Sequence, residues 1–128
     1  MERIKKGDTV EVIAGRDAAE SRRAGKTLRS TVHRVIRAYE TDRYRRKVGR
    51  EPDRDRVVVQ GVNLIIKHQR RTGDVRTQFG RIEMEAPMHI SNVKLVCPSC
   101  KEATRVGFRT SDDGAKARYC KRCDEAID

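Results

Sequence analysis

The feature that most constrains the fold is a fifteen-residue stretch, Val57-Val-Val-Gln-Gly-Val-Asn-Leu-Ile-Ile-Lys-His-Gln-Arg-Arg71. Its first ten residues are dense in β-branched and apolar side chains, and a Gly-Val-Asn step interrupts them. An apolar run this short, with Gly and Asn inside it, predicts two buried strands joined by a tight bend. The last five residues carry three cations, which indicates an anionic partner. A solvated charge run after a core strand is the commoner origin of such a pattern.

The charge of the whole chain favours the anionic partner. Thirty Lys and Arg residues against nineteen Asp and Glu residues leave a net charge of +11 in 128 residues. Residues 16–50 alone hold twelve cations against four anions. Most are Arg, whose planar guanidinium suits phosphate. Nucleic acid is therefore the favoured partner, and a membrane surface is disfavoured because no stretch predicts an amphipathic helix with a large apolar face.

Two absences in the sequence indicate a compartment. A polar stretch follows Met1–Lys6, where a signal peptide would have an apolar segment, and no apolar run approaches membrane-spanning length. The expected location is therefore the reducing cytoplasm, where four cysteines are not expected to form disulfides.

The first strand is predicted near the N-terminus. Gly7-Asp8 is a turn signal, and Thr9 to Ala14 place apolar side chains on one face at a period of two. The spacing Gly-Asp-x-Val-x-Val-x-x-Gly resembles the KOW motif of small SH3-like barrels, which bind RNA in ribosomal proteins and transcription elongation factors. The resemblance implies a mainly β chain with an SH3-like (KOW) barrel over residues 1–75. Its predicted core is Val10, Val12, Val57, Val59, Val62 and Ile65.

Three segments of this barrel depart from the motif or have a conformation that the sequence leaves undecided. Residues 16–26 are expected to form a loop longer than that of the motif, with residues 18–24 as the added part. Residues 28–39 fit a helical face as well as a strand, and the barrel resemblance favours a strand. Residues 40–56 are almost wholly polar and are expected to be an inserted exposed loop or short hairpin. A solvated loop and an arm that reaches RNA are equally open for this insertion.

Two further motifs narrow the resemblance to one ribosomal family. Val-x-Val-x-Gly-Val-Asn followed by Lys67-His-Gln, and Glu85-Ala-Pro-Met-His-Ile-Ser-Asn-Val93, are similar to segments of bacterial large-subunit ribosomal protein number twenty-four. The resemblance implies a structural protein that binds the 5′ region of the large-subunit rRNA early in assembly, near the polypeptide exit. It also implies neighbouring large-subunit proteins as partners and no small-molecule substrate. Residues 76–93 are expected to be a linker whose Ile82, Met84 and Met88 pack on the barrel.

The candidate RNA-binding residues follow from this resemblance and from the charge pattern. Cations of the loop and the following strand would contact phosphates, while the Lys-His-Gln segment and the first lysines would fix the register. RNA bound in this way is recognised by its shape, its phosphates and its 2′-hydroxyls. The full set is Lys5, Lys6, Arg16, Arg22, Arg23, Lys26, Arg29, Asn63, Lys67, His68, Gln69, Arg70 and Arg71.

Four cysteines define the C-terminal part. Cys97-Pro-Ser-Cys100 and Cys120-Lys-Arg-Cys123 have the spacing of a four-thiolate zinc site. Asp112-Asp-Gly114 predicts a hairpin turn between the two pairs. We therefore expect a zinc-ribbon-like tail over residues 94–128, in which one structural zinc ion supplies folding free energy that so short a segment lacks. A tail that binds no metal is the alternative.

Catalytic functions have little support in the sequence. A redox Cys-x-x-Cys pair would sit in a βαβ unit, which is not predicted here. A zinc deaminase needs His-x-Glu, whereas His89 is followed by Ile-Ser. His33, His68 and His89 are scattered, so no catalytic residue is predicted. A KOW-domain factor associated with transcription elongation remains the alternative function, with the tail as its candidate polymerase-binding domain.

Overall fold

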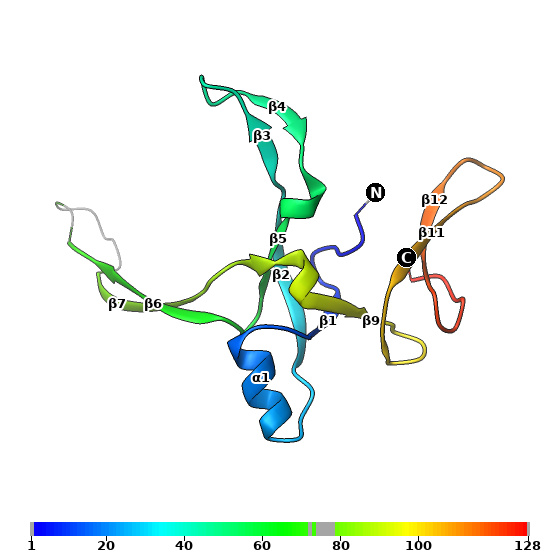
Figure 1. Ribbon diagram of the computed structural model, residues 1–128, viewed down its shortest axis with the longest axis horizontal. Helices are drawn as coiled ribbons and strands as arrows, with labels where there is room; N and C mark the ends of the chain where they lie inside the picture. The colour runs from blue at the N-terminus through cyan, green and yellow to red at the C-terminus, as the bar shows by residue number, and fades with distance from the viewer. Residues whose placement is uncertain (1, 72, 74–78, 128) are drawn as a thin grey trace.

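The computed structural model describes residues 2–71, 73 and 79–127, and its described part has a small central sheet from which hairpins project (Figure 1). The sheet has the strand order β10-β9-β1-β2-β5-β8, and all its neighbouring strands are antiparallel. Its strands are β1 (Thr9–Val12), β2 (Arg29–Ile36), β5 (Arg56–Val59), β8 (Met88–His89), β9 (Val93–Val96) and β10 (Ala103–Thr104).

The remaining strands pair outside this sheet. They form the hairpins β3 (Tyr39–Thr41) with β4 (Lys47–Arg50), β6 (Leu64–Gln69) with β7 (Gly80–Glu85), and β11 (Val106–Thr110) with β12 (Lys116–Cys120). An α-helix, α1 (Arg16–Arg23), follows β1, and the short 3-10 helices are η1 (Pro52–Arg54) and η2 (Ile90–Asn92). The prediction of a mainly β chain is confirmed. In the described part of the chain, no helix is long and apolar enough to cross a membrane.

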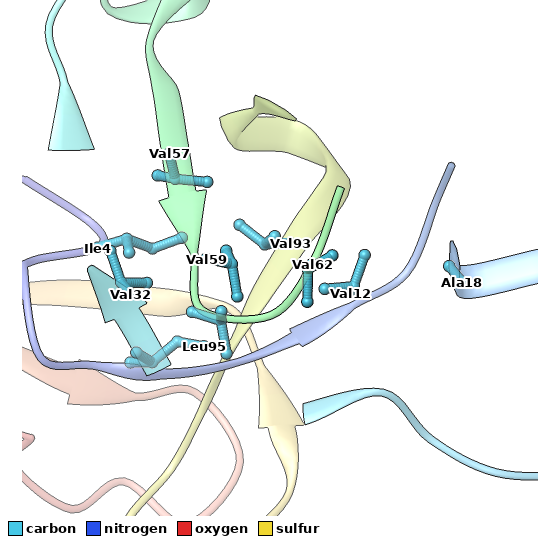
Figure 2. Packing of buried hydrophobic residues seen from close by; sticks show 10 residues of the cluster. Ile4, Val12, Ala18, Val32, Val57, Val59, Val62, Val93 and Leu95 are labelled. Atoms are coloured by element: carbon cyan, nitrogen blue, oxygen red, sulfur yellow. The ribbon is translucent and has the colours of Figure 1, made fainter. Parts of the chain in front are cut away.

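The core lies where β1, β2, β5 and β9 pack their β-branched side chains together (Figure 2). Five of the six predicted core residues are buried there, and the prediction for Ile65 is wrong because 44% of this residue is exposed. After Asn63 the chain leaves the sheet, and β6 pairs only with β7. A two-stranded arm has no second layer to cover it, so the second predicted strand exists but is not buried. The buried cluster is Ile4, Val10, Val12, Ala18, Val32, Val57, Val59, Val62, Val93 and Leu95.

Truncating a core valine should distinguish the sheet from the β6–β7 arm. Val59 is fully buried, so Val59→Ala should lower the free energy of unfolding by about 1–3 kcal/mol through lost burial and the cavity left behind. Ile65→Ala, the matched control in the arm, should cost less than about 1 kcal/mol because that side chain already meets water. Urea unfolding followed by circular dichroism measures both. Equal losses in the two variants would contradict this assignment of the core.

The segment predicted as a loop over residues 16–26 is mostly helix. Residues 16–23 form α1, whose buried Ala18 joins the core cluster. Asp17 lies in the first turn, and Arg22 and Arg23 lie in the last, so both charge signs complement the helix dipole. Gly15 precedes the helix with φ 107°, a conformation that glycine adopts without strain. The loop prediction was wrong because the resemblance to the motif outweighed this run of good helix formers.

The other open segments are resolved by the pairing of strands. Residues 29–36 form a strand, as the barrel resemblance favoured, and the predicted hairpin within residues 40–56 is present as β3 and β4. Residues 80–85 form β7, a strand, where a linker is predicted. Of the apolar side chains predicted to pack on the barrel, Met88 of β8 packs against the core, whereas Met84 of β7 is exposed.

The predicted start of the tail at residue 94 falls inside β9. This strand pairs with β1 on one side and with β10 on the other, so it belongs to the central sheet. The reason is that Val93 and Leu95 point into the shared core. The cysteine-containing segment therefore continues directly from the sheet.

Candidate functional site

The four cysteines converge at the end of the sheet. One sulfur from each residue lies within 4.8 Å of the other three. The Sγ atoms of Cys97 and Cys123 are 3.7 Å apart, and those of Cys100 and Cys120 are 4.0 Å apart. Sulfurs bound at about 2.3 Å around a tetrahedral zinc ion lie about 3.8 Å from one another. The cluster can therefore hold one metal ion with four protein ligands, an arrangement that leaves no coordination position for catalysis.

Both cysteine pairs have the same backbone turn. The carbonyl oxygen of Cys97 accepts a hydrogen bond from the N–H of Lys101 at 2.9 Å, and that of Cys120 accepts one from Asp124 at 3.0 Å. Lys101 and Asp124 both have positive φ, 56° and 64°. This repeated turn aims the two sulfurs of each pair at one point. The first turn connects β9 to β10 and the second follows β12, so strand pairing brings the pairs together.

The closely spaced thiols have pKa values shifted in opposite directions. Burial raises the pKa of Cys120, but hydrogen bonds from the N–H groups of Cys123 and Arg122 outweigh burial and lower that pKa to about 6. For Cys123, the N–H of Glu125 lowers the pKa, while burial and the neighbouring thiols outweigh it and raise the pKa to about 12. Four thiolates this close repel one another, so a soft divalent cation is the group that the donor set fits.

Two arginines attach the cysteine cluster and its hairpin to the sheet. Arg118 of β12 donates to both carboxylate oxygens of Asp8, at 2.5 Å and 3.2 Å, and to the carbonyl oxygen of Arg3. Arg29 of β2 donates to Glu11 at 2.9 Å and to the carbonyl oxygen of Lys101, in the first cysteine turn, at 2.8 Å. These contacts orient the hairpin β11–β12 relative to β1 and β2.

Two predicted RNA-binding residues have internal structural roles. Arg29 directs its guanidinium at Glu11 and at the cysteine turn, so these two hydrogen bonds use part of its donor capacity within the chain. Asn63 has φ 56° at the bend between β5 and β6, where asparagine is tolerated. Its side-chain amide donates to Ala86 at 3.1 Å and its N–H donates to Asp17 at 2.6 Å. The sequence alone does not show whether such an asparagine forms a bend or contacts RNA.

The helix presents a second group of predicted residues. Arg16, Arg23 and Lys26 are exposed at α1 or just after it. Arg16 lies 3.5 Å from Asp17, while Arg22 donates to the carbonyl oxygens of Ala18 and Ile13 at 3.3 Å each. The helix therefore holds several cations in fixed positions, and Arg23 and Lys26 are those most available to a phosphate.

The β6–β7 arm carries most of the remaining residues. Lys67 and His68 are exposed on β6, Gln69 is half-buried at its end, and the exposed Arg70 and Arg71 follow the strand. Arg81 of β7 lies opposite His68 and adds a cation that was not predicted. Arg81 could have been predicted as part of this basic surface only if residues 80–85 had been identified as the strand that pairs with β6.

The predicted residues do not form one continuous patch. The helix and the β6–β7 arm extend from the central sheet in different directions (Figure 1). Lys5 and Lys6 lie before β1, where Lys6 is exposed and the N–H of Lys5 donates to Asp8 at 2.7 Å. A partner that touches all of these surfaces must therefore be large or must wrap around the sheet.

Comparisons with known proteins cover the sheet, the arms and the cysteine cluster. A family model described as "Large ribosomal subunit protein uL24, C-terminal domain" matches residues 62–127. Curated proteins named large ribosomal subunit protein uL24 align over nearly the whole chain. The one from Fervidobacterium nodosum is 46% identical over 99% of this chain and 96% of its own length. Those from Thermosipho melanesiensis and Halothermothrix orenii are 48% and 46% identical, each over 98% of this chain and over 96% and 98% of their own lengths.

Proposed function

The chain belongs to the family of large ribosomal subunit protein uL24, and from this we propose that it is a structural protein that binds the RNA of the large ribosomal subunit. Its predicted place is at the 5′ region of that RNA, near the polypeptide exit, where it would act early in assembly and contact neighbouring large-subunit proteins. The proposal includes a cytoplasmic location within the ribosome and no catalytic role.

The observation that carries RNA binding is the set of exposed cations on separate rigid supports. Arg16 and Arg23 lie on α1 and Lys26 just after it, while Lys67 and Arg70 belong to the β6–β7 arm, in a chain whose net charge is +11. Such cations bind phosphates without reading the bases, and they position a protein on folded RNA by shape. Release of counterions from the RNA would drive the binding.

The metal in this proposal is one structural zinc ion held by Cys97, Cys100, Cys120 and Cys123. The sulfur separations and the paired turns support it. The ion would link the turn that follows β9 to the turn that follows β12. We accordingly propose that the chain divides into a body, which includes α1 and the β6–β7 arm, and a tail that begins at the first cysteine pair.

Neutralising the helix cations should weaken the salt dependence of RNA binding. In Arg23→Ala/Lys26→Ala, the slope of log K against log salt should become less steep by about 1.4–1.8, because two phosphate contacts at roughly 0.7–0.9 each are lost. Titration of protein-free large-subunit rRNA at several KCl concentrations measures this slope. The control Lys116→Ala/Lys121→Ala removes two exposed cations from the tail and should leave the slope within about 0.5 of wild type. A wild-type slope in the helix variant would show that α1 faces away from the RNA.

Sedimentation separates the ribosomal function from the transcription alternative. The tagged protein should migrate with large subunits through a sucrose gradient after a moderate salt wash. Migration with RNA polymerase instead would favour the factor associated with transcription elongation.

A further inference from the structure

The β3–β4 arm, defined as residues 38–55, has no part in the predicted RNA-binding set. It contributes no side chain to the buried core cluster, and Tyr44 at its tip is 63% exposed. In Figure 1 it projects from the sheet in a direction different from those of α1 and the β6–β7 arm. A two-stranded hairpin is marginally stable by itself, so one that is held rigidly away from the core calls for a partner.

The base of this arm is held by Asp55. This buried carboxylate accepts hydrogen bonds from both terminal nitrogens of Arg50 at 2.5 Å each, and from the N–H of Ala38 at 2.9 Å. The Arg50 guanidinium holds the pKa of Asp55 below its ordinary value, so the pair stays charged at neutral pH. Arg50 also donates to the carbonyl oxygen of Ala38 at 2.8 Å, which closes the two ends of the hairpin.

The tip of the arm is equally ordered. The carboxylate of Asp42 accepts hydrogen bonds from the N–H groups of Tyr44 at 2.8 Å and Arg46 at 2.9 Å. Arg45 takes positive φ, 60°, at this turn. The result is a fixed turn whose Arg43, Tyr44 and Arg45 side chains are exposed. Fixed supports lower the ordering cost that binding would otherwise incur.

Each tyrosine of the arm lies beside two cations. Arg43 and Arg46 stand over the Tyr44 ring at 4.7 Å and 5.4 Å from its centroid. Lys47 and Arg50 stand in the same way over Tyr39, at 4.5 Å and 5.4 Å. Rings stack on bases while the flanking cations meet phosphates, the combination that proteins use to bind single-stranded nucleic acid.

An open groove of about 490 Å³ continues this surface at the base of the arm. Four cations and one carboxylate line it, a net charge of +3, and the carboxylate of Glu2 is already paired with Arg37. Among the residues that the structure describes, Arg43, Arg45 and Lys47 form no ion pair with a carboxylate. The lining residues are Glu2, Lys6, Arg34, Val35, Arg37, Tyr39 and Lys47.

We propose that the β3–β4 arm and this groove form a second RNA-binding surface, which takes a segment of ribose-phosphate backbone in the groove and an unpaired base on Tyr44. The proposal rests on the RNA-binding function proposed above and adds a site outside the helix and the β6–β7 arm. Because the arm and α1 point away from the sheet in different directions, one molecule would join two segments of RNA. Two linked contacts would raise the affinity beyond that of either alone.

The test uses the full chain and protein-free large-subunit rRNA. Arg43→Ala/Arg45→Ala/Lys47→Ala should make the slope of log K against log salt less steep by about two units or more, and should weaken binding at least tenfold at physiological salt. The matched control Arg105→Ala/Lys116→Ala/Lys121→Ala removes three exposed cations from the tail and should change the slope by less than about 0.5. Hydroxyl-radical footprints should show a segment that is protected in wild type and in Arg23→Ala/Lys26→Ala but not in the arm variant. The segment at α1 should lose protection only in Arg23→Ala/Lys26→Ala, and protection by the β6–β7 arm should stay in both variants.

A second variant tests stacking separately from charge. Tyr44→Leu should weaken binding at least fivefold with an unchanged salt slope, because a stacked base is lost without a phosphate contact. Tyr44→Phe keeps the ring and should bind within about twofold of wild type. The exposed position of Tyr44 makes both variants compatible with the fold, and circular dichroism verifies it.

The outcomes that overturn the proposal are distinct. If the arm variant matches its control in slope and footprint while wild type binds, this surface does not contact RNA and only the second site fails. If the same variant binds RNA normally but releases a ribosomal protein from reconstituted subunits, the arm binds a protein instead. If wild type itself shows no saturable binding to the rRNA, the proposed function fails.

Discussion

Replacing Cys97 with serine is expected to unfold the chain beyond β9 while the sheet core stays folded. The variant loses one of four thiolates, and the apparent binding free energy of a structural zinc ion is on the order of 10 kcal/mol or more. The hairpin β11–β12 has little core of its own, because Phe108 is exposed and no side chain of the hairpin belongs to the buried core cluster. Hydrogen exchange should show lost protection in β10, β11 and β12, with protection retained in β1, β2 and β5. Elemental analysis should give one zinc per wild-type chain and nearly none in the variant.

The control for this prediction lies in the same turn. Ser99→Ala changes an exposed residue between the first two cysteines and should keep the metal and the protection. A chelator or mild acid should reproduce the effect of Cys97→Ser in wild type, because the ligands bind as thiolates. Metal-free protein with full protection of β11 and β12 would end the zinc proposal. The assignment to the ribosomal family would stand, since it rests on the similarity of the whole chain.

Breaking the ion pair between Arg118 and Asp8 should have the second large effect. The two side chains are 4% and 15% exposed and bind in a bidentate geometry. Arg118→Ala would leave a largely buried carboxylate without its cation, at a cost of about 3–5 kcal/mol. Urea unfolding measures this loss. We also expect the tail to keep its zinc, because Arg118 supplies no ligand, while its hairpin loses its fixed orientation relative to β1.

Two comparisons make this prediction specific. Arg54→Ala removes an exposed arginine that pairs with Glu51 at 3.2 Å, and it should cost less than about 1 kcal/mol. Asp8→Ala/Arg118→Ala should recover part of the loss, because no unpaired buried charge remains. If Arg118→Ala were as stable as Arg54→Ala, the contact would not anchor the tail.

Much of the site was accessible from local patterns. Metal ligands must come in pairs that one turn can aim at an ion, so Cys97-x-x-Cys100 and Cys120-x-x-Cys123 predicted a cluster before any fold was known. Apolar side chains at a period of two predicted β1, because a strand alternates its faces. The short run of β-branched residues that starts at Val57 predicted β5. Asp112-Asp-Gly114 predicted the turn between β11 and β12 in the same way. These features depend on residues close in sequence, whose chemistry needs no knowledge of distant neighbours.

Tertiary pairing decided what local patterns left open. Ile65 is as apolar as Val59, yet it is exposed because β6 pairs with β7 outside the sheet. The bond from Arg29 to Lys101 and that from Arg118 to Asp8 join residues 72 and 110 positions apart, and no spacing rule relates them. The sequence alone determined which segments extend, which turn and which can bind a metal, because those properties are set within a few residues. Only the tertiary structure decided which strand faces water and which cation is already paired, because burial and ion pairing depend on atoms that distant segments bring into contact.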